Sequence, residues 1–260
     1  MWPAFGRRLM RRRWRCAGRS AITAGSGVAE VTASELPWLS VIVPALNESE
    51  QIRQTLGELQ ALREHGVEII VVDGGSSDGT ADMARPLADQ VLSSDRGRAR
   101  QLNAGAAHAR GRVLLFLHAD TRLPAGAIAA VQAATAQDAL AWGRFDVRII
   151  GHALMLPVIA WFINQRSRFS GIATGDQALF FTRELFYRIG RFPQQPLMED
   201  VEISRRAKGV CPPRCLRLRV STSGRRWERY GVWRTIWLMW MLRYRYWRGV
   251  SPAVLARSYR

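Results

Sequence analysis

Carboxylates follow two apolar runs of this chain at the point where each run ends. The run at residues 69–72 is followed by Asp73 and two glycines, and the run at 113–117 by His118-Ala119-Asp120. A carboxylate at the carboxyl end of a buried parallel strand, followed by small residues, can meet a nucleotide with both side chain and backbone. Asp120 could hold Mg²⁺ or Mn²⁺ mainly through substrate phosphates, because these hard cations prefer oxygen ligands. The pattern indicates a nucleotide and metal site.

Four further side chains could do chemistry, and each also has a structural interpretation. Asp78 either supports a bound nucleotide or caps the helix that follows it. His118 contacts a metal or phosphate, or is a structural histidine. Glu199 and Asp200 open a helix, whose dipole stabilises negative charge. An ionised carboxylate there could accept a proton from an attacking hydroxyl, or both acids could simply be favourable residues for a helix start.

Apolar runs alternate with amphipathic segments along most of the chain, and this predicts an α/β fold. The expected strands are 39–43, 67–72, 90–92, 113–117, 142–149 and 178–181, and the expected helices are 48–63, one from 78, 99–109, 124–136, 152–162 and 198–208. Such alternation indicates right-handed βαβ units in an open, mostly parallel, Rossmann-like sheet flanked by helices. Ligands bind at the carboxyl ends of the strands in such sheets.

The formal net charge of +17 is concentrated at the two ends of the chain. Residues 1–27 carry +7 and residues 183–260 carry +13, whereas residues 28–182, which hold most of the motifs, carry −3. A nucleic-acid-binding module that is basic over a whole face is therefore not favoured, and no nucleic-acid partner is expected. Basic ends suit a diphosphate or an anionic membrane surface better.

The chain divides into three expected parts. Residues 1–35 form an Arg-rich extension without the apolar stretch of a secretory signal, and we expect it to be disordered. Residues 36–228 form the catalytic domain, and 229–260 an amphipathic C-terminal helix. The expected location is the cytoplasm, with peripheral contact at the inner face of the cell membrane as the further alternative.

The C-terminal segment 232–247 is too polar to span a bilayer, since its longest apolar run has seven residues. At 100° per residue its aromatic side chains fall on one stripe, and arginines flank them. An aromatic stripe edged by arginine is typical of a helix lying in the membrane interface. The alternative is that the stripe packs on the core or on a partner subunit.

Four motifs in order resemble family 2 glycosyltransferases with a GT-A fold. They are Ser40-Val41-Ile42-Val43-Pro44-Ala45-Leu46-Asn47-Glu48, Val71-Val72-Asp73-Gly74-Gly75-Ser76-Ser77-Asp78-Gly79-Thr80, His118-Ala119-Asp120 and Met198-Glu199-Asp200. Within that family the chain is most similar to the bacterial radical-SAM/selenodomain-associated transferase 2 group, which is linked to arsenosugar biosynthesis. The resemblance implies inverting transfer of a sugar from a nucleotide-sugar donor, a UDP-sugar by preference, to a small-molecule or lipid acceptor.

The resemblance also assigns roles by position. Asp73 would bind the base, Asp120 the divalent metal at the diphosphate, and Asp200, next to Glu199, would be the general base. The remaining donor-site residues that it implies are Pro44, Asn47, Glu48, Asp78, Arg100, Asn103 and His118.

Two departures from the family pattern have consequences. His118 stands where the family's aspartate-any-aspartate motif has its first acid, which leaves Asp120 as the expected metal ligand. Ser223 replaces the glutamine of the Gln-any-any-Arg-Trp motif, so a single-transfer enzyme is expected rather than a polymerase. Arg225 or Arg226 could still hold a diphosphate, as guanidinium groups do.

Two other classes of protein remain as alternatives. A nucleotidyltransferase of similar topology would show a glycine-rich loop with a lysine after the first strand, where this chain has Pro44-Ala45-Leu46-Asn47-Glu48. A non-enzymatic, basic nucleic-acid-binding module is the second alternative, and steeply salt-dependent affinity for DNA would support it.

Overall fold

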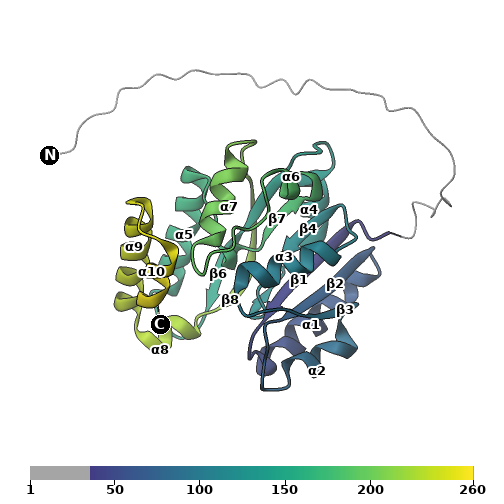
Figure 1. Ribbon diagram of the computed structural model, residues 1–260, viewed down its shortest axis with the longest axis horizontal. Helices are drawn as coiled ribbons and strands as arrows, with labels where there is room; N and C mark the ends of the chain where they lie inside the picture. Colours follow the sequence, from purple (N-terminus) through teal and green to yellow (C-terminus); the bar gives the residue numbers. More distant parts are fainter. Residues whose placement is uncertain (1–35, 260) are drawn as a thin grey trace. The chain divides into compact units, whose positions relative to one another are not determined.

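A computed structural model describes residues 36–259, and Leu36–Arg260 form one compact unit. The expected extension at 1–35 lies outside the described residues. A single sheet of eight strands runs through residues 36–259 (Figure 1). The strands are β1 (Leu39–Ala45), β2 (Val67–Asp73), β3 (Gln90–Ser93), β4 (Val113–Phe116), β5 (Thr121–Arg122), β6 (Trp142–Ile150), β7 (Leu179–Thr182) and β8 (Arg214–Ser223).

The sheet has the order β3-β2-β1-β4-β7-β6-β8-β5. Strands β3, β2, β1 and β4 are parallel, and β6 and β8 are also parallel to each other. Strand β7 is antiparallel to both β4 and β6, and β5 is antiparallel to β8. The predicted α/β class with an open, mostly parallel sheet is confirmed.

Helices cover both faces of this sheet (Figure 1). They are α1 (Ser49–Arg63), α2 (Thr80–Ala84), α3 (Arg98–His108), α4 (Ala127–Thr135), α5 (Leu156–Ser170), α6 (Arg183–Arg188), α7 (Glu199–Lys208), α8 (Arg225–Tyr230), α9 (Val232–Trp247) and α10 (Pro252–Ser258), with short 3₁₀ turns η1 (Arg85–Leu87) and η2 (Gly175–Gln177).

Successive side chains of a strand point to opposite faces of the sheet, and this divides the core into two clusters. Val41 and Val43 of β1 belong to a cluster that includes buried residues of α1, α4 and α5. Ile42, on the opposite face of the same strand, belongs to a cluster with α3, α6 and α7. Because both faces are covered, the central strands are continuous apolar runs, the pattern from which they were predicted.

The carboxyl ends of the parallel strands lie at one edge of the sheet. Ala45 of β1 pairs in register with Asp73 of β2, and Ile42 pairs with Phe116 of β4. The loops that leave these strands therefore start close together, and each leads into a helix or into the His118-Ala119-Asp120 segment. This arrangement supplies the edge at which α/β sheets bind ligands.

The C-terminal helices pack on the domain through a separate small cluster. Leu242 of α9 and Leu255 of α10 are buried against Met198, the residue that precedes α7. Five aromatic side chains of α9 remain exposed: Trp233, Trp237, Trp240, Tyr244 and Trp247. Within residues 36–259, no helix has both the length and the apolar character needed to cross a bilayer.

Candidate active site

The end of β2 holds Asp73 in a fixed position. The side chain is buried, and its Oδ2 accepts hydrogen bonds from the backbone N–H groups of Gly75 and Ser76, both at 3.0 Å. Its Oδ1 is buried and has no hydrogen-bond partner within the described residues. A buried acceptor without a partner costs free energy, so Oδ1 suits an N–H donor from a ligand. Pro44 lies half-buried in β1, opposite Val72.

Asp78 and Asn47 tie the β1–α1 loop to the β2–α2 loop. The Asp78 carboxylate accepts hydrogen bonds from the Thr80 hydroxyl at 2.5 Å and from the Ser49 backbone N–H at 3.0 Å. These bonds, the Thr80 hydroxyl first, hold the pKa of Asp78 well below its usual value. Asn47 has a φ of 53° and its Oδ1 accepts the Ser77 N–H at 3.0 Å. Both predicted site residues therefore shape the loops around Asp73.

Asp120 and Glu48 lie on either side of one guanidinium group. Nη2 of Arg225 is 3.8 Å from Oδ2 of Asp120 and 3.2 Å from Oε2 of Glu48, and it donates to Oε1 of Gln51 at 2.6 Å. Burial raises the pKa of Glu48 from its ordinary value. The expected metal ligand thus lies within an acidic pair that already attracts a cation.

These residues fit a divalent cation that is held largely by the ligand. Within residues 36–259, no group of three or more histidine, cysteine, aspartate or glutamate side chains could form a complete protein site. A hard cation such as Mg²⁺ often takes only one or two carboxylates and completes its shell with phosphate oxygens and water. Asp120 and Glu48 supply that number of carboxylates.

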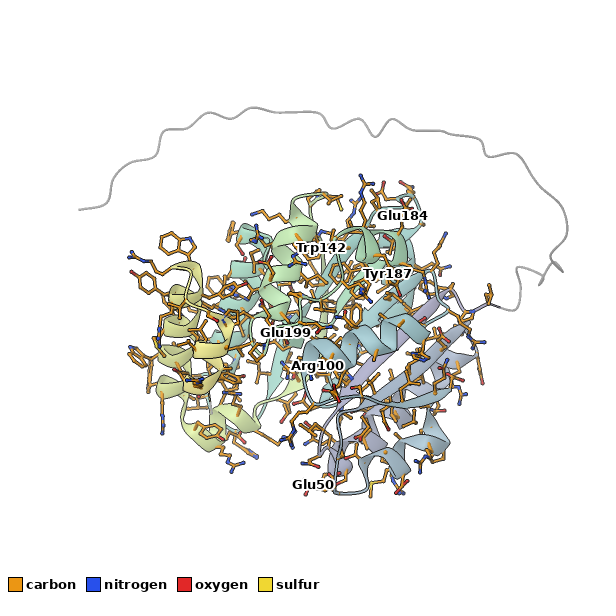
Figure 2. All side chains as sticks on the ribbon, viewed as in Figure 1. Glu50, Arg100, Trp142, Glu184, Tyr187 and Glu199 are labelled. Carbon is orange, nitrogen blue, oxygen red and sulfur yellow. The ribbon has the colours of Figure 1, made fainter. Side chains whose placement is uncertain are left out.

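Helix α7 begins with the two acids that were expected to include a base. Asp200 accepts hydrogen bonds from the backbone N–H of Gly175 at 2.9 Å through Oδ2 and from that of Val201 at 2.8 Å through Oδ1. Glu199 is buried at the start of α7 (Figure 2). Its pKa is raised to about 7, first by burial and then by the charge of Asp200. Glu199 is therefore partly protonated near neutral pH.

His118 faces Asp200 and η2, whereas Asp120 faces Arg225. A cavity of about 10 Å³, the size needed for one water, is lined in part by His118, Glu199 and Asp200. A Cβ added at Gly175 would come within 2.6 Å of Nε2 of the imidazole, so only glycine allows this approach. Burial lowers the pKa of His118 well below its usual value. A neutral imidazole therefore lies beside the candidate base.

Helix α3 carries the last two predicted donor residues. Arg100 is exposed and its Nη1 lies 3.3 Å from Oδ2 of Asp95 (Figure 2). The Asn103 amide donates to the backbone O of Phe192 at 2.8 Å and accepts the Phe192 N–H at 3.1 Å. Asn103 thus anchors the segment that leads into α7.

Five side chains near the site are absent from the sequence-based prediction. Arg98 lies 3.9 Å from Glu199 (Nη1 to Oε1). The buried Gln101 amide donates to the backbone oxygens of Ala45 at 2.7 Å and Val72 at 2.9 Å, which ties the ends of β1 and β2 together. The other three are Arg166, Asp176 and Arg243.

Arg98 and Arg100 lie on the same helix, α3, and helical geometry bears on which of them can reach α7. Residues 98 and 100 are about 200° apart around a helix, so only one of them can face α7. The sequence of this helix alone does not say whether that residue is Arg98 or Arg100.

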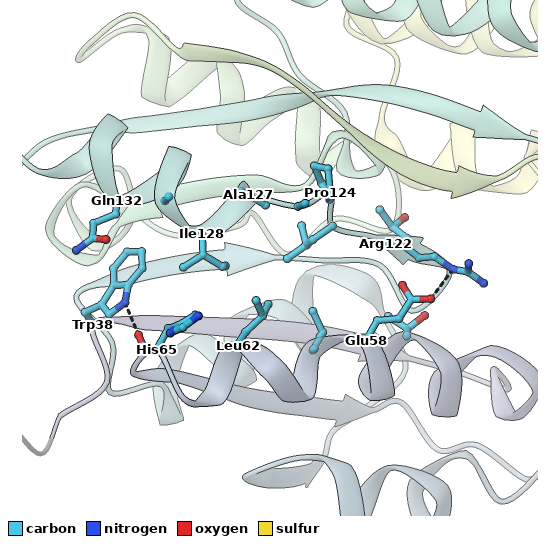
Figure 3. A pocket seen from close by; sticks show the side chains of 16 residues that line it. Trp38, Glu58, Leu62, His65, Arg122, Pro124, Ala127, Ile128 and Gln132 are labelled. Carbon is cyan, nitrogen blue, oxygen red and sulfur yellow. Dashed lines mark hydrogen bonds and ion pairs between the residues drawn. The ribbon is translucent and has the colours of Figure 1, made fainter.

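A groove of about 740 Å³ lies between α1 and the segment leading into α4, and none of the predicted site residues lines it (Figure 3). Several of its polar groups are paired with each other. Arg122 lies 3.3 Å from Glu58 (Nε to Oε1), and the Trp38 indole N–H donates to the backbone O of His65 at 2.9 Å. We therefore assign the chemistry to the sheet edge.

Comparison with known proteins finds a matching family model and similar proteins. The family model "Glycosyl transferase family 2" matches residues 40–190. An uncharacterized glycosyltransferase of Mycobacterium tuberculosis is 29% identical over 201 residues, which cover 72% of this chain and 76% of that protein.

Two solved structures share the fold. The mannosyltransferase PcManGT of Pyrobaculum calidifontis, in complex with GDP-Man and Mn²⁺, has a TM-score of 0.54 and 26% identity over 72% of this chain and 57% of that chain. S. aureus TarS with UDP-GlcNAc has a TM-score of 0.56 and 18% identity over 71% and 58%.

Proposed function

The chain belongs to glycosyl transferase family 2 and is a glycosyltransferase, and from this premise we propose that it is an inverting, metal-dependent enzyme that uses a UDP-sugar as donor. The acceptor is a small molecule or a lipid that presents a hydroxyl group. The radical-SAM/selenodomain-associated transferase 2 group remains our proposal for the subgroup, on the motifs quoted above.

The observation that carries the donor proposal is the unpartnered Oδ1 of Asp73. Oδ2 already accepts two backbone N–H groups, so the carboxylate has one oxygen left for a base. Uracil offers a single imide N–H, which matches one free acceptor. Guanine presents two adjacent donors, which a carboxylate meets best with both oxygens. The geometry favours UDP over GDP, although the similar mannosyltransferase was solved with GDP-Man.

Charges at the end of β4 support metal-assisted departure of the diphosphate. Asp120 and Glu48 would hold a divalent cation, which supplies electrostatic neutralisation of the leaving group. Mn²⁺ is bound in the similar mannosyltransferase structure. Arg225, now bonded to these acids and to Gln51, can turn its guanidinium to the diphosphate as the ligand enters.

Asp200 is proposed as the general base. Its two hydrogen bonds from backbone N–H groups stabilise the ionised carboxylate and orient it. The acceptor hydroxyl oxygen attacks the anomeric carbon, its proton passes to Asp200, and the bond from that carbon to the diphosphate oxygen breaks. Attack from the face opposite the leaving group inverts the anomeric centre, and no enzyme nucleophile is required.

Peripheral attachment to the inner face of the cell membrane is proposed from α9. Its exposed tryptophans lie on a helix that also carries Arg245 and is followed by Arg248, a composition suited to an anionic interface.

A donor panel tests the proposed function. We expect UDP and UDP-sugars with Mn²⁺ or Mg²⁺ to raise the Tm more than the GDP forms do, because a ligand that binds only the folded state stabilises it. Asp73→Asn should weaken UDP binding by about tenfold or more, since an amide N–H would face the base N–H. Asp82→Asn, an exposed carboxylate of α2, is the control. Equal stabilisation by UDP and GDP in both proteins would contradict the donor assignment.

A further inference from the structure

Two arginines near Asp200 have no role in the chemistry above. Arg166 lies on α5 and Arg243 on α9, and both are half-buried. Helices α5 and α9 lie in the same part of the fold (Figure 1), and each guanidinium is within the electrostatic field of Asp200. The two side chains come from segments 77 positions apart, so only the folded chain brings them together.

Neither guanidinium has a matching carboxylate. Among residues 36–259, no carboxylate oxygen lies within the 4.0 Å that defines an ion pair with either of them. Arg166 has one weak hydrogen bond, from Nη2 to Oγ1 of Thr174 at 3.5 Å, and its Nε is buried without a partner. By contrast, the nearby Arg168 donates to both carboxylate oxygens of Asp146 at 2.8 Å. Arg166 and Arg243 therefore differ from Arg168 in that neither forms an ion pair.

The two positive charges also destabilise each other. Burial first, and then the charge of Arg243, lower the pKa of Arg166 to about 10. Burial likewise lowers the pKa of Arg243. Two like charges removed from water are costly unless an anion joins them.

The nearest acids compensate the charge of the two arginines only in part. Burial raises the pKa of Asp176, which disfavours its ionised form, and its Oδ1 is buried without a partner. Asp200 is engaged with the Gly175 and Val201 N–H groups. The two guanidinium groups thus have two carboxylates nearby, Asp176 and Asp200, and neither forms an ion pair with them.

We infer that Arg166 and Arg243 form an anion subsite that binds a phosphate group of the acceptor and holds the acceptor hydroxyl near Asp200. Two guanidinium forks match the charge and the oxygens of a phosphate monoester. The inference rests on the proposed function, because it takes Asp200 as the base. The phosphate can belong to a lipid headgroup or to a soluble phosphorylated molecule.

Titration with inorganic phosphate tests this subsite, with UDP and Mn²⁺ present to fill the donor site. We expect saturable binding to the wild type, weakened by about tenfold or more in Arg166→Gln and in Arg243→Gln, because each loses a charged hydrogen-bond donor. Arg243→Lys should keep part of the affinity. Arg234→Gln, an exposed arginine of the same helix, should bind phosphate as the wild type does.

A separate UDP titration keeps the two proposals distinguishable. UDP should bind all these variants equally. Absence of UDP binding to the wild type would refute the donor proposal, and phosphate titration without UDP would still test the arginine pair. Absence of saturable phosphate binding to the wild type, or Arg166→Gln and Arg243→Gln variants that bind phosphate as tightly as Arg234→Gln, would overturn the inference.

Competition identifies the source of the phosphate. Phosphatidylcholine vesicles containing phosphatidic acid, which has a phosphate monoester headgroup, should displace inorganic phosphate if the acceptor is a lipid. Displacement by glycerol 3-phosphate and not by these vesicles would support a soluble acceptor. Displacement by neither probe would overturn the assignment to an acceptor.

Discussion

Glu199 and Asp200 are adjacent in the sequence, but their contacts and their burial differ. Asp200 accepts two backbone N–H groups, whereas Glu199 is buried and lies 3.9 Å from Arg98. Burial and the adjacent Asp200 charge raise the pKa of Glu199 to about 7. A protonated Glu199 removes one negative charge from the vicinity of the proposed diphosphate site without involving Asp200, the proposed base.

The pKa of Glu199 predicts how stability changes with pH. Between its ordinary pKa of 4.5 and the folded value of about 7, the folded chain holds more protons than the unfolded chain. The free energy of unfolding therefore falls as pH rises through this interval and levels off above it. Glu199→Gln removes the titration. We expect it to raise the free energy of unfolding at pH 8, relative to wild type, by about 1 to 3 kcal/mol.

Urea unfolding at pH 5 and pH 8 measures this effect. Glu202→Gln is the matched control on the same helix. Glu202 lies 2.8 Å from Arg205 and 2.9 Å from Arg206, and these arginines lower its pKa, so its substitution should destabilise the protein at pH 8. A Glu199→Gln variant that loses as much stability as Glu202→Gln at pH 8 would contradict the raised pKa.

Residues at strand ends could be predicted from sequence, whereas several side-chain partners could not. Asp73 follows an uninterrupted apolar run, so its place at the sheet edge was clear. The choice between Arg225 and Arg226 was not, because adjacent helical residues point about 100° apart. The structure directs Arg225 to Glu48 and places Arg226 on the ring of Tyr259, 3.8 Å from its centroid.

At the scale of elements, the central strands and the helices between them follow the predicted pattern closely. Helix α5 differs, since it was expected at 152–162 and spans Leu156–Ser170. Pro157 suits the first turn, where its missing N–H costs nothing. The helix continues beyond 162 because the Asn164 side chain is buried, donating to the Val147 O at 3.0 Å and accepting the Val147 N–H at 2.8 Å. Such a long-range pair leaves no periodic signal.

Strand β8 could not be predicted from its local sequence. Its first residues, from Arg214 to Arg219, include three arginines and are only partly buried or exposed. The strand forms because β6 offers a parallel partner along Gly143 to Ile150. Whether a partner strand is present depends on the fold of the whole chain, so the β-propensity of the segment alone does not reveal it.

The exposed aromatic side chains of α9 lead to a prediction at the scale of elements. Trp237 and Trp240 are 68% and 73% exposed, so replacing both with serine removes apolar surface without opening the core. We expect Trp237→Ser/Trp240→Ser to bind vesicles rich in phosphatidylglycerol about tenfold more weakly or worse, because less apolar area enters the interface.

Vesicle sedimentation measures the effect, and Leu36→Ser, which changes an apolar residue that is 55% exposed near β1, is the control. Sedimentation that is equal in the wild type, the double variant and the control would favour the alternative in which α9 packs against a partner subunit.

At the scale of the whole molecule, the site divides between two halves of one sheet. Parallel strands β1, β2 and β4 supply Asp73 and the segment that holds Asp120. Helix α7 and the turn η2, which border the remaining strands, supply Asp200 and its hydrogen-bond donor Gly175. Donor binding and proton removal are therefore assigned to separate parts of the chain, and a substitution in one half should leave the other function intact.

Asp200→Asn tests this division most directly. The amide keeps the size of the side chain but cannot accept a proton, so we expect sugar transfer to fall by about 1,000-fold or more. The Kd for the UDP-sugar with Mn²⁺, measured by calorimetry, should change by less than about threefold. The account predicts lost turnover with retained donor binding. Turnover comparable to the wild type, from a variant that still binds the donor, would contradict it.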